Sequence, residues 1–108
     1  MLMEHVKSWQ SELLDKVELN SIWKGKSLTM MISDKRDTVN VCFHRNEIII
    51  NACPFPSSHK IFLRGDLDVL SDIFQGRRKL TSIPKQIIQI KGTFRDVLFV
   101  ESLLLLAK

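Results

Sequence analysis

The sequence is poor in the residue types that build cross-linked or metal-binding sites. Its 108 residues include two cysteines, four glycines, three prolines and no tyrosine. Two cysteines are too few for a disulfide framework or a cysteine-based metal cluster. The three histidines, His5, His44 and His59, lack the close spacing of a helix-borne metal site. We therefore expect no metal, no cofactor and no enzymatic activity.

The two cysteines, Cys42 and Cys53, both lie in apolar, strand-like runs. A cysteine in such surroundings usually packs as a small apolar side chain. A bridge between them would require two adjacent strands in suitable register. We therefore predict two packed thiols, and a disulfide is the alternative.

Long apolar runs are also missing. The amino terminus has no basic segment followed by an apolar run, as a secretory signal would. The longest apolar stretch, residues 97–107, contains Glu101 and Ser102 and is shorter than the ~20 residues of a membrane span. With no linker-like segment, the chain is expected to form a single domain over residues 1–108 in the cytoplasm.

The net charge of +4 is unevenly distributed. Residues 1–59 contain seven Lys or Arg and seven Asp or Glu, whereas residues 60–108 contain nine and five. The densest basic segment is Arg77-Arg78-Lys79, which is either a solvated face or a weak contact for an anionic membrane. Nucleic acid is an unlikely partner, because no aromatic residues alternate with these basic ones.

The first half of the chain predicts one helix and three strands. Apolar residues from Leu2 to Val17 recur at spacings of three and four, which is typical of an amphipathic helix. Alternation of apolar and polar residues then predicts a half-buried antiparallel strand over 38–44. Residues 28–33 and 47–53 are the neighbouring strand candidates, with tight turns at 34–37 and 45–46.

The second half uses one pattern twice: an apolar run ends in a basic residue and Gly, and a helical stretch follows. Gly65-Asp66 and Gly92-Thr93 mark the two junctions, where the Asp or Thr side chain can cap the helix. Residues 60–64 and 86–91 are thus the remaining strands. We predict an α+β fold with a five-stranded, mostly antiparallel sheet flanked by three main helices.

The final helix, which begins near Phe94, is unusual because apolar residues lie on nearly all its sides. Such a helix needs more cover than one sheet face. The cover can be the rest of the fold, a second subunit or an apolar ligand. The homodimer and the ligand cleft both remain open at this point.

Several segments resemble the sterol carrier protein type-two family, the nonspecific lipid-transfer fold. They are Leu63-Arg64-Gly65-Asp66 followed by Leu67 and Leu70, Phe74-Gln75-Gly76 with Lys79-Leu80, and Ile88-Gln89-Ile90-Lys91-Gly92 followed by Val97 and Leu98. The resemblance implies a sterol-carrier-protein-like sheet with helices. It also implies a hydrophobic tunnel for fatty-acyl or sterol-like ligands and no catalytic residues.

The leading functional prediction is non-enzymatic binding of an apolar small molecule or lipid, acyl-chain or sterol-like, in a cleft between the last helix and one sheet face. The alternative is an interaction or homodimerisation module that uses the apolar last helix. From their apolarity and the family resemblance, the residues predicted to line the cleft are Met30, Phe74, Phe94, Leu98, Phe99 and Leu103.

Overall fold

The computed structural model describes residues 2–51 and 59–107. A long helix comes first, three strands follow, and two further strands each lead into a helix. The elements in chain order are α1 (Leu2–Asp15), η1 (Val17–Leu19), α2 (Asn20–Trp23), β1 (Leu28–Ser33), β2 (Thr38–His44), β3 (Glu47–Ile50), β4 (Lys60–Gly65), α3 (Leu67–Phe74), η2 (Leu80–Ser82), β5 (Ile88–Lys91) and α4 (Phe94–Leu106).

The five strands form one sheet in the order β3-β2-β1-β4-β5. Only β1 and β4 run parallel, and the other three neighbouring pairs are antiparallel. This arrangement confirms the predicted α+β fold with a mostly antiparallel five-stranded sheet. β1 and β2 have the predicted bounds. β3 ends at Ile50, and the rest of the predicted 47–53 strand includes residues outside the described part of the chain.

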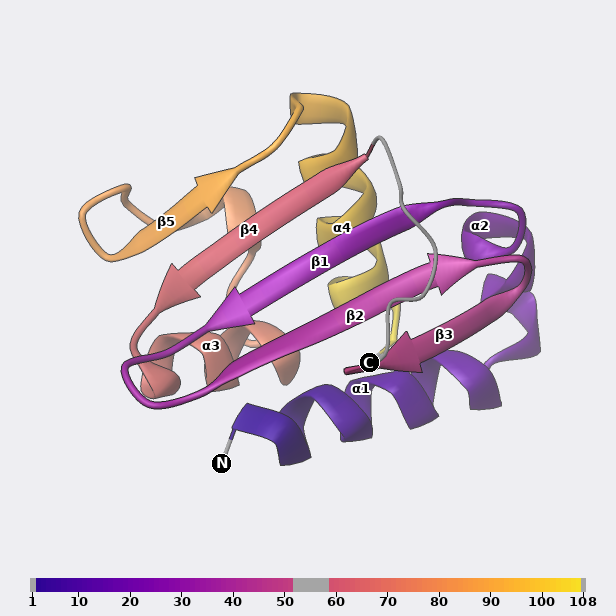
Figure 1. Cartoon of the computed structure of the whole chain (residues 1–108), viewed down its shortest axis with the longest axis horizontal. Coiled ribbons are helices and arrows are strands. Elements are labelled where there is room, and N and C mark those ends of the chain that lie inside the picture. The colour runs from indigo at the N-terminus through magenta and orange to yellow at the C-terminus, as the bar shows by residue number, and fades with distance from the viewer. Residues whose placement is uncertain (1, 52–58, 108) are drawn as a thin grey trace.

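One face of the sheet is covered by helices. Figure 1 shows α3 and α4 behind the sheet, with α4 crossing behind β1 and β4, and α1 running along the lower edge beside β3. Trp9 of α1 packs between Phe43 of β2 and Phe74 of α3, at ring-centroid distances of 6.1 Å and 5.4 Å. Its indole N–H donates to the carbonyl oxygen of Leu103, 3.3 Å away. Large aromatic side chains therefore occupy the space between the sheet and the helices.

The two predicted tight turns are confirmed. Arg45 and Asn46 have φ angles of 47° and 67°, so they join β2 and β3 as a two-residue loop with both residues in the left-handed region. The β1–β2 turn is held by Asp34, whose Oδ1 accepts from the backbone N–H of Arg36 at 2.7 Å and of Asp37 at 2.6 Å. These bonds fix the chain direction between the strands.

Replacing Asp34 by Ala is expected to lower the free energy of unfolding by about 1 kcal/mol, since two backbone donors lose their acceptor. The hydrogen bonds from Asp37 and Arg36 lower the pKa of the Asp34 carboxyl from 3.8. The charged form is thus favoured by folding, and its contribution is present above pH 3.8 and lost as the pH falls through the lower folded-state pKa. Urea denaturation of both proteins should converge in acid; an unchanged difference at low pH would contradict this assignment.

The two strand–Gly–helix junctions differ in detail. At α4 the Thr93 side chain accepts from the backbone N–H of Asp96 at 3.2 Å, which confirms the predicted cap. At α3 the prediction was wrong in part: Asp66 occupies the N-cap position, but its side chain makes no capping hydrogen bond. Its carboxylate instead lies 3.6 Å from the ammonium of Lys35, across the β1–β2 turn.

Cys42 corrects the prediction of a packed thiol, because it is disulfide-bonded. Val41 and Phe43 on either side of it belong to the core cluster and face the helices. Cys42 therefore points to the opposite face of the sheet, outside that cluster, where a bridging partner can approach. Cys53, the other cysteine of the sequence, lies outside the described residues.

The segment between α1 and β1 forms the short helices η1 and α2. Trp23, at the end of α2, is buried beside Phe43 with ring centroids 6.4 Å apart. Trp23 therefore belongs to the core. In the described part of the chain, no helix combines the length and the apolar character needed to cross a membrane.

Candidate functional site: an apolar groove beside β5

The main apolar hollow in the described chain lies along the inner side of β5. It has a volume of about 610 Å³, within the roughly 300–1,000 Å³ range of small-molecule sites. We call it the β5 groove. Its walls come from β5, from η2 with the loop that follows, and from the first turn of α4; the lining residues are Leu80, Thr81, Ile83, Lys85, Ile88, Gln89, Ile90, Lys91, Gly92, Phe94 and Val97.

Gly92 determines how closely the end of β5 approaches β4. A Cβ atom at this position would lie 3.0 Å from Ile61 Cγ1 and 3.2 Å from the Lys60 carbonyl oxygen. The second contact is with backbone, which cannot move as a side chain can. Glycine therefore allows the chain to leave β5 against β4 and enter α4 directly. This places Phe94 and Val97 at one end of the groove.

The opposite wall is fixed by a side-chain clamp between η2 and α4. One carboxylate oxygen of Glu101 accepts from both the backbone N–H and the hydroxyl of Thr81, at 2.8 Å and 2.5 Å. Two donors on one charged acceptor form a strong, well-oriented contact. The loop after α3 is thereby held beside α4.

The groove has an apolar floor and a polar rim. Leu80, Ile83, Ile88 and Val97 are buried and belong to the same core cluster as the residues behind them. Phe94 is 73% exposed, although it lines the groove. Exposed Lys85, Gln89 and Lys91 form the rim on the β5 side. Such a surface suits an apolar body whose polar end remains near cations and solvent.

The six residues predicted to line the cleft occupy several different environments. Met30, Phe74 and Leu103 are buried in the core cluster. Phe94 lines the β5 groove, and Leu98, 39% exposed, lies on α4 outside it. The structure therefore brings three of the six together in the core and places one in the groove.

Phe99 lies in a separate hollow of about 350 Å³ on another side of α4. Its ring packs edge-on against Phe43, with centroids 5.9 Å apart, and the ammonium of Lys26 lies 5.8 Å from its centre. At the mouth of this hollow the His59 imidazole lies 3.3 Å from the Asp96 carboxylate. Phe94 and Phe99 thus lie on different faces of α4.

Sequence reasoning missed the η2 side of the groove. Leu80 and Ile83 lie in a stretch that was interpreted only as a basic loop, because Arg77-Arg78-Lys79 precedes them. Two apolar residues three apart, directly before Pro84, were the available signal that this loop folds back onto the core. Among the described residues, no cluster of three or more His, Cys, Asp or Glu side chains is arranged to hold a metal ion.

No protein-family model matches this sequence, and no curated protein sequence matches it. Several solved structures are similar in fold, among them the following two. One is described as the ubiquinone synthesis protein UbiJ-SCP2: the TM-score is 0.66 and the identity 17%, with 91% of this chain and 83% of that chain covered. The other is a conserved hypothetical protein from Thermus thermophilus, described as a candidate sterol carrier protein, with a TM-score of 0.53, 13% identity and coverage of 96% and 86%.

Proposed function

We propose, from the sterol-carrier-protein-like fold that these structures share with this chain, that the protein is a non-enzymatic binder of an apolar small molecule. The ligand class is acyl-chain or sterol-like, and the site is the β5 groove. The observation that carries the proposal is the apolar floor of that groove, built from Leu80, Ile83, Ile88 and Val97 and bordered by the exposed ring of Phe94.

The physical basis is the transfer of apolar surface out of water. Each Å² of apolar surface that a ligand buries contributes about 25 cal/mol. A ligand in the groove would bury much apolar surface at Phe94, because without a ligand this ring is largely in contact with water. Lys85 and Lys91 at the rim favour a ligand with a carboxylate or phosphate end.

The six residues predicted to line the ligand site enter the proposal in different roles. Phe94 contacts the ligand in the groove. Met30, Phe74 and Leu103 belong to the core cluster that also contains Val97, and a ligand longer than the groove has to displace such packed side chains. Leu98 and Phe99 lie on other sides of α4, away from the groove.

The direct test is native mass spectrometry of protein purified from cells, followed by displacement of a fluorescent fatty acid. We expect a co-purifying apolar molecule and saturable displacement by fatty acids. Protein that carries no bound molecule and gives no saturable displacement would contradict the proposal. Turnover of the added fatty acid would contradict its non-enzymatic part.

Phe94→Ala is expected to weaken fluorescent fatty-acid binding about five- to thirtyfold, because roughly 1–2 kcal/mol of apolar contact is removed. Its stability should change little, since the ring is mostly exposed in the free protein. Leu98→Ala is the matched control, a partly exposed apolar residue on the same helix outside the groove. Equal losses for the two variants in the titration would show that the ligand does not bind in the β5 groove.

The alternative of a homodimerisation module receives less support. It depends on free apolar surface at the end of α4, but Leu103 and Leu104 are buried within the fold. Leu106, 47% exposed, remains accessible on this segment. Sedimentation at several protein concentrations distinguishes the two functions, because a groove-binding monomer does not change its mass with concentration.

The cytoplasmic location predicted from the sequence stays a proposal, and the disulfide of Cys42 is the observation that counts against it. Persistent disulfides are typical of oxidising compartments and rare in the cytosol. Alkylation of the thiols in intact cells, followed by mass analysis of Cys42, would show in which compartment type the protein resides. A largely oxidised Cys42 would contradict the cytoplasmic location.

A further inference from the structure

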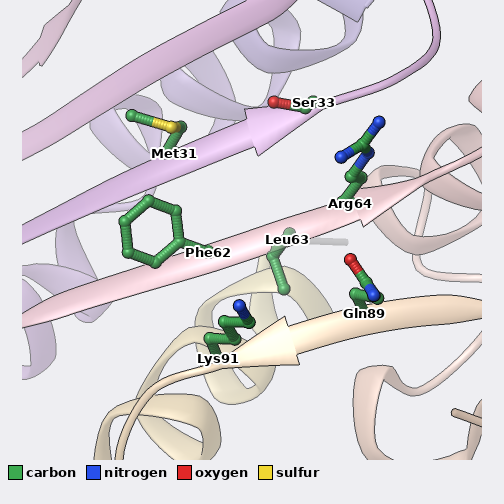
Figure 2. A pocket seen from close by; sticks show the side chains of 7 residues that line it. All are labelled: Met31, Ser33, Phe62, Leu63, Arg64, Gln89 and Lys91. Atoms are coloured by element: carbon green, nitrogen blue, oxygen red, sulfur yellow. The ribbon is translucent and has the colours of Figure 1, made fainter.

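The sheet face opposite the helices carries a second hollow, which borders the β5 groove at Gln89 and Lys91. It has a volume of about 200 Å³ and is drawn in Figure 2. This is smaller than the roughly 300–1,000 Å³ of sites for drug-sized ligands, so it suits a small molecule or one end of a larger one. We call it the outer-face pocket.

Two rows of side chains across β1, β4 and β5 form the pocket. Strand pairing aligns Met31 with Phe62 and Phe62 with Lys91 in one row. It aligns Ser33 with Arg64 and Arg64 with Gln89 in the other. The rows are two residues apart along the strands, or about 6.6 Å. The six side chains therefore surround one shallow hollow on a rigid sheet (Figure 2).

One side of the pocket is apolar and unusually exposed. Phe62 is 41% exposed and Met31 is 36% exposed, and they are direct neighbours on adjacent strands. An aromatic ring beside a flexible thioether accepts alkyl or ring groups of varied shape. This pair can contact the apolar part of a ligand.

The other side carries two cations without a counter-charge. Arg64 and Lys91 are diagonal neighbours on β4 and β5, at a spacing of about 7–8 Å that lets both long side chains reach one anion. Within the described residues neither makes an ion pair, and no carboxylate lines the pocket. Gln89 adds a neutral hydrogen-bonding group between them.

We propose that the outer-face pocket binds the anionic end of a small amphiphile: a carboxylate or phosphate held by Arg64 and Lys91, with the adjoining apolar carbons against Phe62 and Met31. The arginine fork can hold two oxygens of such a group at once. Two exposed ion pairs confer only modest affinity, so binding is weak and falls with added salt. The outer-face pocket and the β5 groove share Gln89 and Lys91 at β5, whereas Phe62 and Arg64 line only the outer-face pocket.

The test is a titration followed by amide chemical shifts in NMR, with octanoate as the anionic probe and 1-octanol as its neutral analogue. We expect saturable octanoate shifts at Phe62 and Arg64 that octanol does not produce. Arg64→Gln should weaken octanoate binding about threefold, and Phe62→Ser about fivefold. Arg78→Gln is the matched control, an exposed arginine outside the pocket that makes the same change in net charge.

A second arm identifies the source of the amphiphile. Co-sedimentation with phosphatidylcholine vesicles, with and without phosphatidylglycerol, tests for a lipid headgroup in a bilayer. Binding that requires phosphatidylglycerol and falls in Arg64→Gln supports a membrane source, and octanoate binding without vesicle binding supports a free amphiphile. The proposal is overturned if neither probe binds, if octanol binds as well as octanoate, or if Arg64→Gln and Arg78→Gln weaken binding equally.

The Phe94→Ala variant separates this site from the β5 groove. Octanoate shifts at Arg64 should persist in Phe94→Ala, because Phe94 does not line the outer-face pocket. Loss of fluorescent fatty-acid binding with these shifts retained would show two independent sites. Loss of both in Phe94→Ala would assign the shifts at Arg64 to the groove and overturn the outer-face pocket.

Discussion

Leu103→Ala is expected to lower the free energy of unfolding by about 2–5 kcal/mol, although the sequence placed this residue in a ligand cleft. The Leu103 side chain is completely buried in the core cluster. Its truncation removes apolar contacts and leaves a cavity that the surroundings only partly fill. Urea denaturation followed by circular dichroism measures the change.

Leu106→Ala is the control for this variant. Leu106 lies on the same helix but is about half exposed, so its loss should cost no more than about 0.5 kcal/mol. If Leu103→Ala lowered the free energy of unfolding by less than about 1 kcal/mol and also weakened fatty-acid binding, Leu103 would instead line a ligand cavity. The variant therefore distinguishes a packed core from a tunnel at this point of α4.

Local sequence signals predicted most of the fold. Val39, Val41 and Phe43 alternate with polar residues, and the same register appears in the β2 pairing with β1. The Gly92-Thr93 junction was recognised because a glycine followed by a capping residue is a local signal. Signals of this kind depend on a few neighbouring residues, so they can be interpreted without the rest of the chain.

The candidate site was much less predictable, because it depends on the face of α4 on which each residue lies. When apolar residues lie on nearly all sides of a helix, the sequence does not indicate which face packs against the sheet. The sequence therefore could not separate Phe94, in the groove, from Phe99, packed against Phe43. The clamp between Thr81 and Glu101, together with the burial of Leu80 and Ile83, holds η2 on one side of the helix and defines the groove. That contact joins residues twenty positions apart, which no local pattern reveals.

The prediction of Cys42 failed for a related reason. Alternation correctly placed it on a strand, but the choice between a packed thiol and a bridge depends on what covers the outer face of the sheet. Sheet-face direction alone would have favoured the bridge, because Val41 and Phe43 already face the core.

Trp9→Ala is expected to have the largest effect on stability, a loss of about 3–5 kcal/mol. The ring joins three elements: it packs on Phe43 and Phe74, and its N–H donates to the carbonyl oxygen of Leu103, which also accepts from the backbone N–H of Ala107. Removing it leaves a large cavity and takes away one of the two donors to that carbonyl oxygen. Since domains are stable by only about 5–15 kcal/mol, the variant should lose a large share of its free energy of unfolding and unfold at a clearly lower temperature.

Trp9→Phe distinguishes the two causes. It keeps an aromatic ring but removes the N–H donor to the Leu103 carbonyl, so we expect a loss of about 1–2 kcal/mol. Trp23, buried beside Phe43, remains in both variants as a fluorescent reporter of thermal unfolding. If Trp9→Ala unfolded at the wild-type temperature, α1 would not be held against the sheet by this ring. If Trp9→Phe lowered the free energy of unfolding as much as Trp9→Ala, the hydrogen bond to α4 would be the dominant contact. The packing of α1 on β2 and α3 would then be secondary.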